Sequence, residues 1–82
     1  MNGGTRVVLV GKEGCHLCDD ARDVVGQVCG LLGVAWTEVS VLDDPRLMDR
    51  YAELIPVVLV DGNEVGHWLI DADRLRAELS DG

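Results

Sequence analysis

The chain has 82 residues, which is enough for one small domain, and we expect residues 1–82 to form it. An apolar fraction of 48% is typical of a globular fold and too high for a disordered chain. Seven basic residues among fifteen acidic ones give a net charge of −8, which argues against binding to nucleic acid or to an anionic membrane surface.

The first half of the chain predicts a strand, a helix and a second strand. Arg6–Val10 is short and rich in β-branched residues, like a buried strand, and Gly11–Gly14 follows as a loop. From Cys15 onward, apolar residues recur every three to four positions, as on one face of a helix that ends at Gly33. Val34–Val41 then predicts the second strand. The expected apolar helix face comprises Leu17, Ala21, Val24, Val28, Leu31 and Leu32.

A short helix is expected after the second strand. Asp43 and Asp44 can cap it, and Pro45 suits its first position. Its inner face would comprise Leu47, Met48, Tyr51 and Ala52.

The last part of the chain predicts a hairpin and a closing helix. Val57–Val60 is a third strand, Asp61-Gly62 is a strong turn signal, and Asn63–Gly66 is a short fourth strand. Asp71–Leu79 predicts the final helix, and Ser80–Gly82 is expected to fray. The order is therefore β-α-β-α-β-β-α, with the first two strands parallel and the last two antiparallel.

The most informative segment is Cys15-His16-Leu17-Cys18, at the junction of the first strand and the first helix. Residues three apart lie on one helix face, so this pair can close a disulfide with little backbone movement. At the helix N-terminus, Cys15 should be exposed and its thiolate stabilised by unpaired N–H groups, whereas Cys18 should be more buried. Lys12 and a protonated His16 favour that thiolate, and Asp19 and Asp20 disfavour it. The pair predicts a dithiol that attacks through Cys15 and resolves through Cys18.

A metal site is the main alternative use of such a pair. Zinc ribbons use two pairs of this kind, and this chain has one. Cys29 lies eleven residues beyond Cys18, which is roughly 16 Å along a continuous helix. We therefore expect no metal site and no bound cofactor, and we expect Cys29 to be an inert core residue.

The expected location is the cytoplasm. The apolar run Val7–Val10 is shorter than the core of a signal peptide or a membrane span. Three cysteines are also an odd number, unlike a secreted disulfide scaffold.

The cysteine pair and the segment Ile55–Gly62 resemble the glutaredoxin and thioredoxin superfamily, and most closely its short bacterial glutaredoxin-like proteins. The resemblance runs from Arg6 to Leu79. It implies a thioredoxin-like fold with a four-stranded mixed sheet and flanking helices. It also implies that Pro56 is cis, packs against the cysteine pair, and leaves the backbone of Ile55 to pair with an incoming peptide or glutathione. The residues expected to contact substrate are Lys12, His16, Leu17, Ile55, Pro56, Gly66 and His67.

Three functions remain open at this point. The first is a thiol–disulfide oxidoreductase acting on protein or glutathione-mixed disulfides. The second is a thioredoxin-fold adaptor with vestigial redox activity, and the third is a metal or iron–sulfur carrier that uses the pair across a dimer. Glutathione is a possible co-substrate, but the acidic surroundings of the pair favour a protein partner. The repulsion between acidic copies favours a monomer.

Overall fold

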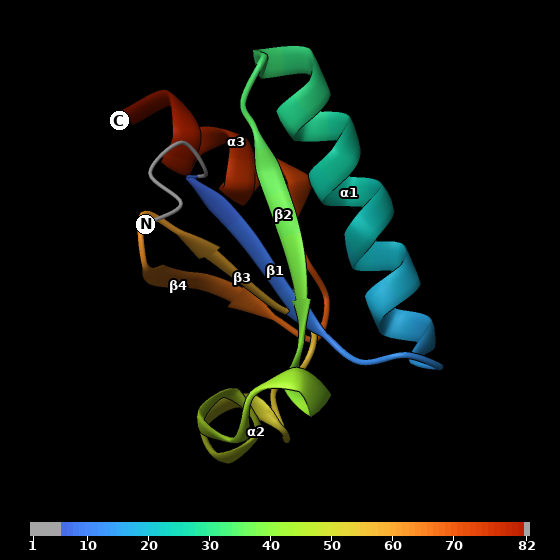
Figure 1. The fold of residues 1–82 in the computed structure, drawn as a ribbon. Coiled ribbons are helices and arrows are strands. Elements are labelled where there is room, and N and C mark those ends of the chain that lie inside the picture. Colours follow the sequence, from blue (N-terminus) through green and yellow to red (C-terminus); the bar gives the residue numbers. More distant parts are fainter. Residues whose placement is uncertain (1–5, 82) are drawn as a thin grey trace.

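One mixed sheet of four strands, in the order β2-β1-β3-β4, organises the chain (Figure 1). It is seen in a computed structural model that describes residues 6–81. Strand β1 (Val7–Gly11) runs parallel to β2 (Trp36–Ser40) and antiparallel to β3 (Val57–Val60). Strand β3 pairs antiparallel with β4 (Asn63–His67). The predicted pairing of the first two and of the last two strands is confirmed.

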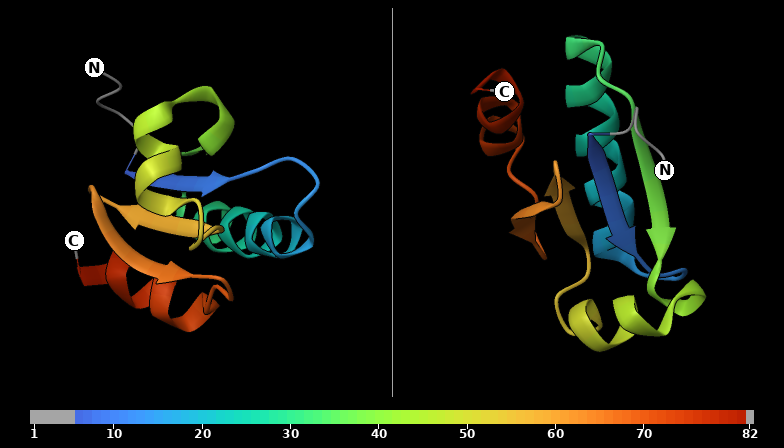
Figure 2. Two further views of the ribbon diagram at one scale, coloured as in Figure 1. Left: turned by 90° about the horizontal axis from the view of Figure 1, so that it is seen from below. Right: turned by 60° about the vertical axis from the view of Figure 1, so that its left-hand side comes forward.

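The helices cover both faces of the sheet (Figure 2). Helices α1 (His16–Leu32) and α3 (Ala72–Asp81) contact each other on one face. Helix α2 (Pro45–Tyr51), which follows a single 3-10 turn η1 (Val41–Asp43), lies on the other. The element order β-α-β-α-β-β-α is the thioredoxin-like order that the sequence predicts.

Alternation along the strands divides the core into two layers. Val7 and Leu9 of β1 pack with α1 and α3, whereas Val8 and Val10 pack on the α2 side with Tyr51. Because successive side chains of a strand point to opposite faces, the unbroken apolar run of β1 supplies both layers. Strand β1 is thus fixed from both sides, and the loop that follows it begins from a rigid support.

The prediction for the buried face of α1 is partly wrong. Leu31 and Leu32 are exposed, and Leu17 is 39% exposed. The face that packs against the sheet is rotated by one position from the expected one, so that Val25 replaces Val24 at its centre. Its buried residues are Cys18, Ala21, Val25, Val28 and Cys29. Cysteine therefore contributes two of the five inward positions, in agreement with the expected burial of Cys18 and Cys29.

Several element boundaries also differ from the predictions. Val41, expected at the end of the second strand, belongs to η1, and Ala52, expected on the inner face of α2, is exposed. Strand β4 extends to His67. Helix α3 includes Ser80 and Asp81, which were expected to fray, while Gly82 lies outside the described residues.

The predicted caps and turn are confirmed. Asp44 accepts a hydrogen bond from the N–H of Arg46 and begins α2, with Pro45 as its first residue. Asp61 and Gly62 have φ angles of 52° and 86°, which the tight hairpin turn requires and which glycine adopts without strain. Gly33 ends α1 in the left-handed conformation. Within residues 6–81 no helix is long and apolar enough to cross a membrane.

Candidate active site

Cys15 occupies the N-cap position of α1, where serine or aspartate is usual. Its backbone is extended, with φ −97° and ψ 117°. Its Sγ accepts a hydrogen bond from the backbone N–H of Cys18 at 3.3 Å, and its carbonyl accepts one from Asp19 at 3.2 Å. The sulfur thus lies at the positive end of the helix and is partly exposed.

Cys18, by contrast, has no exposed surface. Burial is the main cause that raises the pKa of its thiol, from 9.0 to about 11, and the neighbouring Cys15 adds to the effect. All three cysteines of the chain are free thiols in the structure. The expected contrast between a partly exposed Cys15 and a buried Cys18 is confirmed, and at neutral pH the buried sulfur keeps its proton.

Gly11, the last residue of β1, leaves room for the Cys18 side chain because glycine has no Cβ atom. A Cβ atom at Gly11 would lie 3.1 Å from the Cys18 sulfur, closer than side-chain carbons normally approach, and 3.9 Å from Oε2 of Glu38. This close approach explains why the strand ends on a glycine. It also shows that a carboxylate of β2 lies on the same side of β1 as the buried thiol.

That carboxylate is held by an ion-pair network between α1 and β2. Arg22 donates two hydrogen bonds to Glu38 and one to Asp19, each 2.8 Å long. The two bonds that Glu38 accepts from Arg22 lower the pKa of its carboxyl group. The Arg22 guanidinium thus offsets part of the negative charge beside the cysteine pair. A hollow of about 270 Å³ adjoins it, lined by Gly11, Lys12, Glu13, Arg22, Glu38, Val39, Ser40 and Asp43.

The Ile55–Pro56 peptide bond is cis, which confirms the expectation drawn from the resemblance. Pro56 is buried at the entry to β3, and its carbonyl accepts a hydrogen bond from the N–H of Trp68 at 2.9 Å. Ile55 is partly buried. In the described part of the chain, its N–H and C=O form no backbone–backbone hydrogen bond. The backbone at Ile55 is therefore available for an incoming strand.

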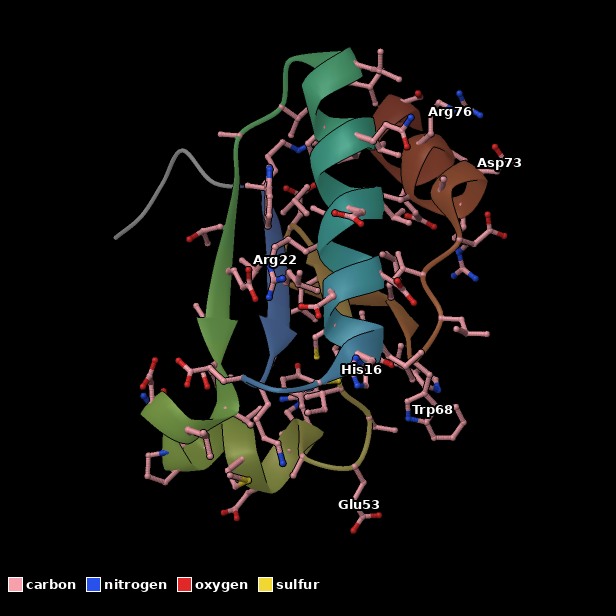
Figure 3. The ribbon with its side chains drawn as sticks, turned by 90° about the vertical axis from the view of Figure 1, so that its right-hand side faces the viewer. His16, Arg22, Glu53, Trp68, Asp73 and Arg76 are labelled. Carbon is pink, nitrogen blue, oxygen red and sulfur yellow. The ribbon has the colours of Figure 1, made fainter. Side chains whose placement is uncertain are left out.

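Trp68 follows β4 and reaches back to the same segment. Its indole Nε1–H donates to the carbonyl of Glu53 at 3.0 Å, and its φ is 61°, unusual for a bulky residue. The His67 ring packs edge-on against it, with centroids 4.9 Å apart. His16 and Trp68 lie at the same end of the molecule, near the start of α1 (Figure 3).

The other expected site residues are distributed around this end in different ways. His16 and Leu17 are exposed in the first turn of α1, and Lys12 is exposed in the loop before it. Gly66 and His67 instead line a hollow of about 410 Å³ with Glu64, Val65, Leu69, Asp71 and Arg74. The His67 ring bonds to Glu64 at 3.0 Å, and no hydrogen bond among residues 6–81 links it to the cysteine pair.

The N-terminus of α3 is occupied by the chain's own carboxylate. Oδ1 of Asp71 accepts hydrogen bonds from the N–H groups of Asp73 and Arg74, at 2.9 and 3.4 Å. Asp71 is therefore the N-cap, whereas the Asp73 carboxylate binds Arg76. These two N–H groups, which could have received a substrate carboxylate, already have a partner.

Sequence reasoning missed the Arg22–Glu38 pair and the two hydrogen bonds of Trp68. All of these bonds connect residues that are at least twelve positions apart, so no local periodicity marks them. A signal that could have pointed to the first is Gly11, because a glycine that ends an apolar strand indicates a close approach. Across residues 6–81, no three His, Cys, Asp or Glu side chains are grouped so that they could hold a metal ion.

Comparison with known proteins agrees with this geometry. The model of the glutaredoxin-like domain family (DUF836) matches residues 6–80, and the chain belongs to that family. The uncharacterized protein Rv0508 of Mycobacterium tuberculosis is 29% identical over 80 residues, which cover 92% of this chain and 82% of that protein.

Solved structures support the fold. The protein XcR50 of X. campestris is 34% identical, with a TM-score of 0.76 and coverage of 93% of this chain and 97% of that one. Reduced Escherichia coli glutaredoxin, at 18% identity, has a TM-score of 0.62 and coverage of 93% and 94%. The second likeness shows that the two chains share the thioredoxin-like fold.

Proposed function

We propose that this protein is a thiol–disulfide oxidoreductase that reduces protein disulfides with the Cys15–Cys18 dithiol. The observation that carries the proposal is the arrangement of the two sulfurs: one is partly exposed at a helix N-cap, and the other is buried one turn later with its pKa raised to about 11. This asymmetry suits a dithiol in which one sulfur attacks the substrate disulfide and the other resolves the mixed disulfide.

The reaction balances without a cofactor. The Cys15 thiolate attacks one sulfur of the substrate disulfide, forms a mixed disulfide, and releases the other substrate sulfur as a thiolate. The Cys18 thiol then loses its proton to water or to that leaving thiolate, attacks the Cys15 sulfur, and releases the second substrate sulfur as a thiolate, which solvent protonates. Two electrons pass to the substrate, and the protein is left with a Cys15–Cys18 disulfide that an external dithiol or two glutathione molecules reduce.

Two measurements on the whole chain test this function. A redox titration against glutathione buffers should give one two-electron transition for Cys15 and Cys18, with Cys29 remaining a free thiol. Insulin-disulfide reduction with dithiothreitol should be accelerated by the wild type and not by Cys15→Ser. A wild-type protein that forms the disulfide but accelerates no reduction would instead favour an adaptor.

We further propose that a protein partner is preferred to glutathione. Glutathione carries two carboxylates, and two N–H groups of α3 are taken by Asp71. Lys12 is the basic side chain nearest Cys15 in sequence, and it forms no ion pair with any of residues 6–81. It is therefore available to pair with one substrate carboxylate. Efficient turnover of a small glutathione-mixed disulfide, with glutathione as sole reductant, would overturn this preference.

The proposed setting is the cytoplasm, with residues 1–82 working as a single-domain monomer. The support is the use of cysteine: three free thiols, two of them buried, suit a reducing compartment. The net charge of −8 opposes self-association. Sedimentation of the reduced protein tests the monomer, and cell fractionation tests the location.

A further inference from the structure

Trp68 connects two segments that are distant in the sequence and meet beside the cis peptide. Its backbone N–H binds the carbonyl of Pro56, and its indole N–H binds the carbonyl of Glu53. The two bonded carbonyls flank Ile55, whose own N–H and C=O form no backbone hydrogen bond in the part of the chain that the structure describes. Trp68 thus holds the segment on either side of an open backbone edge.

The unfavourable backbone conformation of Trp68 indicates that its side chain has a functional role. A φ of 61° places it in the left-handed region, where a bulky residue is disfavoured and glycine is not. A tryptophan at such a position costs conformational energy that glycine would avoid. The indole hydrogen bond to Glu53 offsets part of that conformational energy. A ligand that covers the exposed ring would offset more of it.

The ring of Trp68 also presents apolar surface at the site. Trp68 is 52% exposed although both of its N–H donors have partners, so the accessible part is mainly the apolar ring. Leu17, in the first turn of α1 directly after His16, is another large apolar side chain that is exposed. An open backbone edge beside an aromatic anchor is the usual combination for binding an extended peptide.

We infer that Trp68 sets the substrate specificity of Cys15, selecting a disulfide-bonded extended peptide segment that carries a large apolar side chain next to its cysteine. The inference rests on the proposed function, because it names the substrate class of the same site. In this arrangement the peptide backbone pairs with Ile55, and its apolar side chain covers the indole ring. A carboxylate-rich small thiol gains nothing from the ring and is repelled by the acidic surface.

The test compares two peptides that contain the same disulfide, with either leucine or serine next to the reacting cysteine. For the wild type, kcat/KM for the leucine peptide should exceed that for the serine peptide by about tenfold, the effect expected from partly burying one apolar side chain. Trp68→Asn and Trp68→Gly, both compatible with a positive φ, should reduce the ratio to about twofold or less, through KM. Trp68→Phe keeps a ring and should retain most of the preference.

Leu31→Ala is the matched control, because Leu31 is also an exposed apolar residue, 75% accessible, but lies at the other end of α1. The reduction potential of the cysteine pair should be the same in all variants. If Trp68→Asn and Trp68→Gly lower the rates for both peptides equally, Trp68 has only a structural role and the inference is wrong.

A binding measurement separates this inference from the proposed function. Peptides with serine in place of cysteine, labelled for fluorescence polarisation, are titrated into the Cys15→Ser protein and its Trp68→Asn derivative. Tighter binding of the leucine peptide, lost in the derivative, supports the inference even if the wild type reduces no disulfide. Equal binding of both peptides by Cys15→Ser, together with insulin reduction by the wild type, would overturn the inference and leave the proposed function standing.

Discussion

Cys15 and Cys18 of the candidate site differ because one lies before the first turn of a helix and the other lies within it. Cys15 is the N-cap, so its sulfur remains partly exposed and accepts the N–H of Cys18. Cys18 points toward the end of β1 and loses contact with water. A spacing of three residues is therefore enough to give two chemically identical side chains different degrees of burial.

The first prediction follows from this difference. Cys18→Ser should accumulate a mixed disulfide between Cys15 and its substrate, because the second step is removed while the attacking sulfur remains. Cys15→Ser should accumulate none, since the Cys18 thiol is buried and has a pKa of about 11. Non-reducing electrophoresis with a disulfide substrate reads the adducts. Trapping by Cys15→Ser in place of Cys18→Ser would reverse the two roles.

Gly11→Ala should slow the resolving step. The added methyl group would lie 3.1 Å from the Cys18 sulfur, which must shift by a few tenths of an ångström. We expect slower release from the mixed disulfide and a loss of stability of about 1 kcal/mol. Quenched-flow analysis and urea unfolding measure the two effects.

Gly30→Ala is the matched control for that substitution, because nothing lies within 4 Å of the added methyl group. In the interior of α1 it should raise stability by up to about 1 kcal/mol and leave resolution unchanged. Equal resolution rates for Gly11→Ala and the wild type would show that the contact with the buried sulfur has no kinetic role.

The raised pKa of Cys18 also predicts how stability depends on pH. The folded value, about 11, lies above the ordinary value of 9.0 that the unfolded chain would have, so the folded state retains the proton more tightly. The corresponding stability is fully present below pH 9.0 and is lost as the pH rises through about 11. The loss should amount to about 2 kcal/mol in the reduced protein.

Urea unfolding across that pH range measures this effect in reduced and oxidised protein. The oxidised protein is the control, because a Cys18 sulfur in a disulfide has no proton to lose. Burial also raises the pKa of Cys29, which contributes with the same sign in both forms. Identical pH profiles for the two forms would contradict the assigned burial of the Cys18 thiol.

At the scale of the elements, the sequence predicted every helix and strand but not which side of α1 faces the sheet. The sequence predicted that the apolar stripe of Leu17, Leu31 and Leu32 faces the sheet. The stripe that packs against the sheet is the neighbouring one, which includes Cys18 and Cys29. The two stripes differ by one residue, and periodicity alone does not rank cysteine and valine above leucine. The choice is made by tertiary packing against Val7 and Leu9.

The candidate site shows the same division between local and distant information. Cys15 and Cys18 could be predicted because they lie in a short motif, whereas the cis bond before Pro56 was implied by the resemblance to glutaredoxins and thioredoxins. The bonds from Trp68 to Glu53 and Pro56 depend on how β4 returns beside β3, and no local pattern encodes that. Loop contacts of this kind require the three-dimensional fold.

The N-terminus of α3 provides a prediction at this scale. Asp71→Ala removes the carboxylate that accepts two backbone N–H bonds, and should cost about 1 kcal/mol of stability. Asp73→Ala is the matched control, because that carboxylate only pairs with Arg76 on the surface, where an ion pair contributes little. Thermal unfolding separates them. An equal loss in both variants would mean that the cap contributes no more than an exposed ion pair.

At the scale of the whole molecule, charge should act on the rate of encounter. The net charge of −8 repels anionic substrates and attracts basic peptides, and salt screens both effects. Raising the ionic strength should increase kcat/KM for a glutathione-mixed disulfide and decrease it for a lysine-rich peptide disulfide. Stopped-flow reduction at several salt concentrations measures both trends, with an uncharged peptide as control. The same salt dependence for all three substrates would contradict electrostatic steering.

The positions of the two tryptophans have a practical consequence. Trp36 opens β2, is partly buried and lies against Gly26 in the middle of α1, whereas Trp68 lies at the end where α1 begins (Figure 3). The fluorescence of the native chain therefore has one partly buried reporter against α1 and one at the end of the molecule where the Cys15–Cys18 helix begins. Trp36→Phe leaves Trp68 as the single tryptophan, and excitation at a wavelength that Tyr51 does not absorb allows turnover to be followed in real time without a dye.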